Sequence, residues 1–225
     1  MFWLLPYFIP LATLYEFEEY FRLLPPVLGI AVFLPMWLKT RKEAPRYVNK
    51  HFPRLVALTI GLFAGFSIFI VGLMALTGAA RLAPESTDVP ADLSWVRLLG
   101  VVILAPIAEE LCYRGVTLNR LDWLTKWEAV LICAVLFALA HWELYRIINV
   151  LPFAILIGAL YMKFRSIIAV IAGHSAYNLF VTISSVIDAN APQYVFPSVL
   201  GALAIISALC AYALVKLPGA ARVEQ

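Results

Sequence analysis

The sequence has few charged residues: only 14% of its 225 residues are Asp, Glu, Lys or Arg. Soluble domains carry about 25% charged residues, and about half of their residues are apolar. Here 63% of the residues are hydrophobic. This composition excludes an ordinary soluble domain and predicts an all-α polytopic membrane protein, because a helix satisfies its own backbone polar groups inside a bilayer. The net charge of only +3 argues against a nucleic-acid partner.

Several other features are scarce or missing. The three cysteines, Cys112, Cys133 and Cys210, lie in apolar runs and have no framework spacing, which predicts free thiols rather than disulfides. The N-terminal Met-Phe-Trp-Leu-Leu-Pro lacks the basic flank of a signal peptide, so we expect the first span to begin there. No serine stands in a nucleophile motif, which disfavours an acyl-enzyme mechanism.

Apolar runs separated by charge clusters predict a bundle of about eight transmembrane helices that forms one membrane-embedded unit over residues 1–225. The first two are short and contain prolines. In the third, Gly61 and Gly65 have the small-xxx-small spacing that is typical of close helix packing. The expected spans are roughly 2–16, 23–38, 55–77, 95–120, 127–142, 147–162, 166–187 and 195–216.

Lysine and arginine fall mainly on one side of these spans, twelve against four. Cytoplasmic loops carry the excess of such residues, so both termini are expected in the cytoplasm. The opposite side also carries an acidic loop around Glu85, Asp88 and Asp92. The twelve are Lys39, Arg41, Lys42, Arg46, Lys50, Arg54, Arg120, Lys126, Lys163, Arg165, Lys216 and Arg222; the four are Arg22, Arg81, Arg97 and Arg146.

Six polar side chains lie within the predicted spans, where an ionisable group is costly unless it faces a cavity and finds partners. They come from spans four, five and seven: Glu109, Glu110, Arg114, His141, His174 and Asn178. A spacing of four residues puts Glu110 and Arg114 on one helix face. The two polar residues of span seven share a face in the same way, and Tyr113 shares the face of Glu109.

The depths of these residues agree. With a rise of about 1.5 Å per residue, Glu110 and the polar residues of spans five and seven lie about 12–21 Å from the cytoplasmic ends of their spans, which is near the middle of a bilayer about 30 Å thick. A purely structural ion pair needs only one carboxylate for Arg114. Two carboxylates, two histidines and an amide at one depth therefore favour a shared intramembrane site over isolated interhelical contacts.

A carboxylate beside a histidine in a cavity can take a proton from water, and histidine or asparagine donors can hold the oxyanion that forms when water attacks a carbonyl. This predicts peptide or amide hydrolysis within the membrane. Two alternatives remain open. Glu109, His141 and His174 have the donor types of a catalytic zinc site, although not the His-Glu-x-x-His spacing. A binding, immunity or transport protein could use the same charges without catalysis.

Three motifs resemble those of the CPBP family, which comprises type II CAAX prenyl endopeptidases and bacteriocin-processing enzymes. The first, Glu109-Glu110-Leu-Cys-Tyr-Arg114-Gly115, is similar to EExxxR(G). Phe137-Ala-Leu-Ala-His141 is similar to FxxxH, and His174-Ser-Ala-Tyr-Asn178 to HxxxN. The resemblance covers roughly 95–187, expected to be the catalytic core. Three motifs in order, each within its own span, are much more specific than any one of them.

The resemblance implies a glutamate-type intramembrane endopeptidase that requires no metal. In that scheme Glu109 and His141 activate water, and the two polar residues of span seven form the oxyanion site. The Glu110–Arg114 pair orients and charge-balances the base. We expect a protein or peptide substrate that is cut near the cytoplasmic half of the membrane. The short chain is similar to bacterial members of the inner membrane, for which prenylated substrates are not expected.

Overall fold

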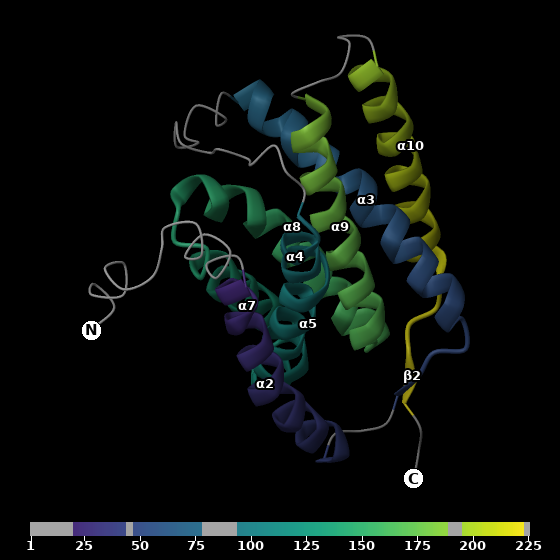
Figure 1. The fold of residues 1–225 in the computed structure, drawn as a ribbon. Helices are drawn as coiled ribbons and strands as arrows, with labels where there is room; N and C mark the ends of the chain where they lie inside the picture. The colour runs from purple at the N-terminus through teal and green to yellow at the C-terminus, as the bar shows by residue number, and fades with distance from the viewer. Residues whose placement is uncertain (1–19, 44–46, 78–93, 189–194, 223–225) are drawn as a thin grey trace, which may run out of the picture.

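The computed structural model describes residues 20–43, 47–77, 94–188 and 195–222, most of them helical (Figure 1). The expected span 2–16 and the acidic loop around Glu85 lie outside the described residues. In chain order the helices are α2 (Leu24–Glu43), α3 (Phe52–Thr77), α4 (Trp95–Leu98), η3 (Leu99–Leu104), α5 (Ala105–Glu110), η4 (Leu111–Thr117), α6 (Leu118–Arg120), α7 (Lys126–Leu139), α8 (Leu144–Phe164), α9 (Ile167–Asp188) and α10 (Val195–Lys216).

The expected span 95–120 is one continuous helical stretch, but it alternates between α-helical and π-helical turns. The π-helical segments are η3 and η4, and such wider turns are frequent at functional sites. A side-chain amide adds hydrogen bonds to one of them: Asn119 donates to the carbonyl oxygens of Arg114 and Gly115 over 3.1 and 2.9 Å. The sequence pattern predicted only the span and not these changes of helical pitch.

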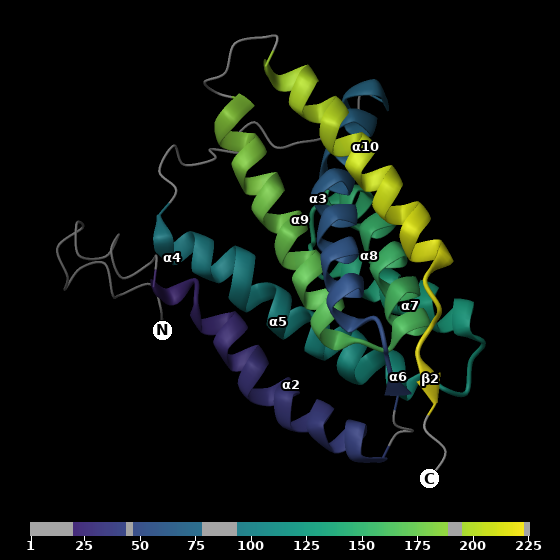
Figure 2. The same ribbon diagram turned by 90° about the vertical axis from the view of Figure 1, so that its right-hand side faces the viewer.

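Helix α3 is held between α9 and α10 (Figure 2). Its glycines face α10 so closely that a Cβ at Gly61 would lie 2.6 Å from the Cys210 sulfur, and one at Gly65 would overlap the Leu203 carbonyl oxygen. On the other side, a Cβ at Gly173 of α9 would lie 2.6 Å from Phe63. The close packing predicted from the small-xxx-small spacing is therefore confirmed, because only glycine permits this approach.

The basic segments meet at one end of the bundle. Strand β1 (Tyr47–Val48) pairs antiparallel with β2 (Ala221–Arg222), which joins the loop after α2 to the segment after α10. The guanidinium of Arg165 lies 5.5 Å from the centre of the Tyr47 ring, and Ala220 N donates to the Lys163 carbonyl over 3.1 Å. The all-α fold class predicted from the sequence thus holds for most of the described residues, with this two-residue pairing as an addition. We refer to this region as the basic end.

The outer surface of the bundle is apolar. Ile205, Leu209 and Val215 of α10 are exposed, as are Leu131 and Val135 of α7. Contiguous exposed apolar surface marks contact with lipid or protein. Within the described residues one helix, α8, is long and apolar enough to cross a membrane, and shorter apolar segments occur at Phe52–Ser67, Ile167–Ile183 and Gly201–Lys216. The bundle of eight spans therefore stays a prediction.

Candidate active site

Glu110 and Arg114 form a fully buried ion pair. Both side chains have 0% exposure, and Arg114 Nη1 donates to Glu110 Oε1 over 3.0 Å, as the spacing of four residues predicted. Arg114 Nη2 donates to the Ala154 carbonyl of α8 over 3.1 Å, and its guanidinium carbon lies 4.8 Å from the centre of the Phe137 ring. These contacts offset part of the desolvation of the guanidinium, whose Nε has no hydrogen-bond partner among the described residues, and they tie α5, α7 and α8 together.

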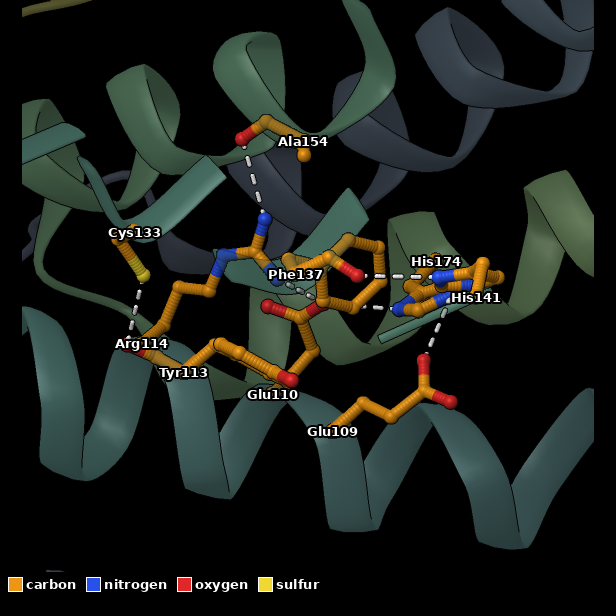
Figure 3. Close-up of polar contacts among 9 residues, drawn as sticks. All are labelled: Glu109, Glu110, Tyr113, Arg114, Cys133, Phe137, His141, Ala154 and His174. Carbon is orange, nitrogen blue, oxygen red and sulfur yellow. Dashed lines mark hydrogen bonds and ion pairs between the residues drawn. The ribbon is translucent and has the colours of Figure 1, made fainter. Parts of the chain in front are cut away.

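His174 connects the two glutamates. Its Nδ1 lies 2.8 Å from Glu110 Oε1, and its Nε2 lies 3.6 Å from Glu109 Oε2 (Figure 3). The imidazole packs beside two aromatic rings, with its centre 4.8 Å from that of Phe153 and 5.9 Å from that of Phe137. Because a carboxylate oxygen can only accept, Nδ1 donates to Glu110.

The two adjacent glutamates have different surroundings. Glu110 is sealed inside the bundle, whereas the Glu109 side chain is 34% exposed. Glu109 lines a cavity of about 300 Å³. The other lining residues come from the same helical stretch, from α7, from the α7–α8 connection and from α8: Tyr113, Phe137, Ala140, His141, Trp142 and Arg146.

His141 lies on the same cavity but not on a helix. The α7 helix ends at Leu139, so the expected span 127–142 is too long by three residues, and His141 follows in a turn. Its Nδ1 lies 3.0 Å from the Phe137 carbonyl oxygen. Since that oxygen can only accept, the proton is on Nδ1, and Nε2 of the neutral ring is an acceptor. His141 and His174 both lie close enough to Glu109 to interact with its charge.

The main contact of Asn178 is with a residue outside this cluster. Its side-chain amide donates to the carbonyl oxygen of Val101, within η3, over 2.8 Å. Sequence spacing placed Asn178 on the face of His174, and both do lie on α9. The hydrogen bond that the structure adds joins α9 to η3. The structure thus brings Glu109, Glu110, Arg114 and His174 into direct contact, sets His141 beside them, and gives Asn178 a backbone partner.

Helix α8 contributes residues that the sequence did not single out. Phe153 packs on His174, and the carbonyl of Ala154 accepts a hydrogen bond from Arg114. Neither belongs to a polar motif, and a phenylalanine in an apolar run carries no signal of function. Arg146 was counted only as a loop charge, yet it lines the cavity. On α7, Cys133 also contacts the site through a hydrogen bond to the Tyr113 carbonyl over 3.2 Å.

The position of the cavity changes one expectation from sequence. Its lining residues Ala140, Trp142 and Arg146 follow the end of α7 that is farthest from Lys126. Fourteen residues of helix span about 20 Å. The cavity therefore borders the α7–α8 connection, away from the basic residue that begins α7. Access near the cytoplasmic half, which the sequence suggested, does not match this position if the basic end is cytoplasmic.

The suggested zinc ligands are not grouped around a common point. Within the described part of the chain, no three His, Cys, Asp or Glu side chains form a set that would hold a metal ion. Glu109, His141 and His174 supply suitable donor atoms, and the hydrogen bonds of the two histidines to Phe137 and Glu110 use Nδ1 and leave Nε2. The described positions of these donors nevertheless do not form the zinc site considered from the sequence.

Comparison with known proteins adds one match. Residues 91–180 match the family model described as type II CAAX prenyl endopeptidase Rce1-like, an integral membrane protease family. The searches of curated proteins and of solved structures each returned no significant match. The matched segment contains all six polar residues and most of the region 95–187 in which the motif resemblance was found. Residues 91–180 are therefore similar to this membrane-embedded CAAX protease family, which supports the resemblance that the three motifs indicated.

Proposed function

We propose that this protein is an intramembrane endopeptidase that hydrolyses peptide bonds with water activated by Glu109 and His141. The observation that carries this proposal is the division of labour between adjacent carboxylates. Glu110 is sealed and paired with Arg114, whereas Glu109 is partly exposed on a cavity that it shares with His141. A general base has to reach water, and only Glu109 of the two can do so.

In this mechanism a water molecule lies between the Glu109 carboxylate and Nε2 of His141. Glu109 takes a proton from the water while the water oxygen bonds to the carbonyl carbon of the peptide. The carbonyl oxygen becomes an oxyanion. Glu109 then returns the proton to the amide nitrogen as the C–N bond breaks, so that an acid and an amine leave. Such proton transfer contributes typically 10²- to 10⁴-fold to the rate.

His174 and Asn178 are proposed to stabilise the oxyanion. His174 Nε2 is 3.6 Å from Glu109 Oε2, which is longer than a hydrogen bond. Because Nδ1 donates to Glu110, Nε2 donates to a developing charge nearby when the ring carries a proton on both nitrogens. Asn178 uses its amide on Val101, but an amide group has two N–H donors. Glu110 and Arg114 hold His174 through Nδ1, so we assign them the orientation and charge balance of the site.

The proposed setting is the inner membrane of a bacterium, with both termini and the basic end in the cytoplasm. That orientation follows from the excess of Lys and Arg in cytoplasmic loops. The cavity then opens toward the opposite half of the bilayer, because it borders the α7–α8 connection. The partners are a protein or peptide substrate and the lipid bilayer, with no nucleic acid. No metal is required in this proposal.

The decisive test replaces Glu109 by glutamine, with Asp122→Asn as the matched control. Asp122 is an exposed carboxylate between α6 and α7, so the control makes the same chemical change outside the site. Membrane peptides from cells with each allele are compared by mass spectrometry. We expect cleavage products to disappear with Glu109→Gln and to persist with Asp122→Asn. A folded Glu109→Gln protein with an unchanged peptide pattern would overturn the proposal.

The same preparations separate the alternatives. Metal analysis of the purified protein, with and without chelation, addresses zinc: a stoichiometric ion together with chelator-sensitive cleavage would replace the metal-free mechanism. A non-enzymatic binding, immunity or transport role predicts that His141→Ala leaves the cellular phenotype intact. We expect His141→Ala to lose the phenotype together with the cleavage products.

A further inference from the structure

The rim of the cavity carries a positive charge, in contrast to the carboxylate inside it. Arg146, in the first turns of α8, lines the same cavity as Glu109 and His141. Its side chain is 56% exposed, so its charge is available to a ligand that enters from outside. The described lining thus combines a guanidinium with the proposed general base.

Arg146 is oriented for a second carboxylate. Its Nε lies 2.7 Å from Glu143 Oε2, one turn earlier. A guanidinium has five N–H donors in a planar fork, and this contact uses the Nε–H. The two terminal nitrogens carry the other four donors, in the geometry that binds a carboxylate through two parallel hydrogen bonds. An exposed ion pair such as this one contributes little to the stability of the fold, so its geometry is better explained by orientation of the guanidinium.

The backbone beside Arg146 supports a binding role for this rim. Trp142 has a φ of 62°, in the left-handed region that a non-glycine residue rarely adopts. Its side chain is 89% exposed, so burial of the indole does not repay this conformation. Strained residues of this kind gather at ligand clamps. The turn redirects the chain after His141 so that Arg146 of α8 returns to the cavity.

We propose that Arg146 binds a carboxylate of the peptide substrate and so selects peptides with a negative charge close to the scissile bond. The inference rests on the proposed function in taking the occupant to be a peptide. The cavity, at about 300 Å³, is at the small end of ligand sites. It therefore accepts a short segment of a peptide. A free C-terminus and an acidic side chain supply the same chemistry.

Binding is measured in the Glu109→Gln background, so that the result does not depend on catalysis. The probes are pools of apolar hexapeptides with a neutral fluorophore at the N-terminus. One pool ends in a free carboxylate, a second in a carboxamide, and a third in a carboxamide with aspartate at the fifth position. Fluorescence anisotropy with the full chain in neutral detergent gives the affinity of each pool.

We expect the free acid to bind roughly tenfold more tightly than the carboxamide, as one charge-assisted bidentate contact provides. The added substitution Arg146→Gln should abolish this preference, whereas Glu143→Gln, which keeps an acceptor for Nε, should retain it. Arg146→Glu should reverse the preference toward a pool that ends in a protonated aminoethylamide. Tight binding of the third pool would identify an acidic side chain, rather than the C-terminus, as the source of the carboxylate.

Equal affinity for the acid and amide pools, absence of binding to every pool, or a preference that survives Arg146→Gln would each overturn the inference. These outcomes are separate from failure of the proposed function. If the acid is preferred through Arg146 but no cleavage depends on Glu109, the carboxylate site stands and the protease assignment falls. If cleavage depends on Glu109 but the acid and amide pools bind equally, the reverse holds.

Discussion

Replacing Arg114 by methionine removes one charge from a pair that has no access to water. Methionine keeps most of the side-chain length but loses three contacts: with Glu110 at 3.0 Å, with the Ala154 carbonyl at 3.1 Å and with the Phe137 ring at 4.8 Å. Removing one partner of a buried pair costs about 3–5 kcal/mol, because the other charge is left uncompensated. His174 still donates a hydrogen bond to Glu110 in this variant, so the loss of unfolding free energy should stay within that range.

We therefore expect Arg114→Met to lower the free energy of unfolding by about 3–5 kcal/mol. The double variant Glu110→Gln/Arg114→Met removes both charges and keeps an amide oxygen for His174. It should be more stable than the sum of the two single effects by at least about 1 kcal/mol, as expected for side chains in direct contact. Unfolding of the purified protein in mixed micelles, followed by tryptophan fluorescence, measures each term.

Two results would refute this reasoning. A cost below about 1 kcal/mol for Arg114→Met would mean that the guanidinium is not desolvated in the native protein. Strict additivity in the double variant would mean that Glu110 and Arg114 do not interact. The exposed substitution Asp122→Asn, expected to change stability by less than about 0.5 kcal/mol, controls for the general effect of altering a carboxylate.

Three further predictions follow from the packing and from the cavity. Gly65→Ala should lower the free energy of unfolding by about 1–3 kcal/mol, because a Cβ would overlap the Leu203 carbonyl oxygen. The control Gly201→Ala should be neutral or stabilising, because no atom lies within 4 Å of a Cβ at that position. The unfolding midpoints of the two variants measure the difference. Glu110→Gln should destabilise the protein more than Glu109→Gln, because only Glu110 of the two pairs with a buried arginine. Equal losses of unfolding free energy in the same assay would contradict the different surroundings of the two glutamates. In a background without native cysteines, Trp142→Cys should react with an impermeant maleimide in intact cells; labelling only after permeabilisation would place the cavity on the cytoplasmic side.

The helices and the main polar pairing were predictable from the sequence. Expected spans 23–38, 55–77 and 166–187 correspond to α2, α3 and α9, because an apolar run and its flanking charges are local features. The pairing of Glu110 with Arg114 was predictable for the same reason, since the helical repeat places residues four apart on one face. The same rule correctly placed Gly61 and Gly65 on one packing face.

The roles of the two glutamates were not predictable in this way. Adjacent residues on a helix point about 100° apart, so one of them faces the interior, but the spacing does not say which. That depends on how the helix from Trp95 to Arg120 is rotated against α8 and α9. The π-helical turns of η3 and η4 alter this rotation, and they have no clear signature in the residue pattern.

The remaining site residues depend on contacts between distant segments. Phe153 packs on His174, Asn178 bonds to Val101, and Arg146 reaches the cavity of Glu109 after a left-handed turn at Trp142. By itself the sequence determined which residues are polar where a membrane span should be apolar, and which share a helix face, because these properties depend on local spacing. Which carboxylate meets water, and what lines the cavity beside it, depend on helix rotation and approach, which only packing in three dimensions specifies.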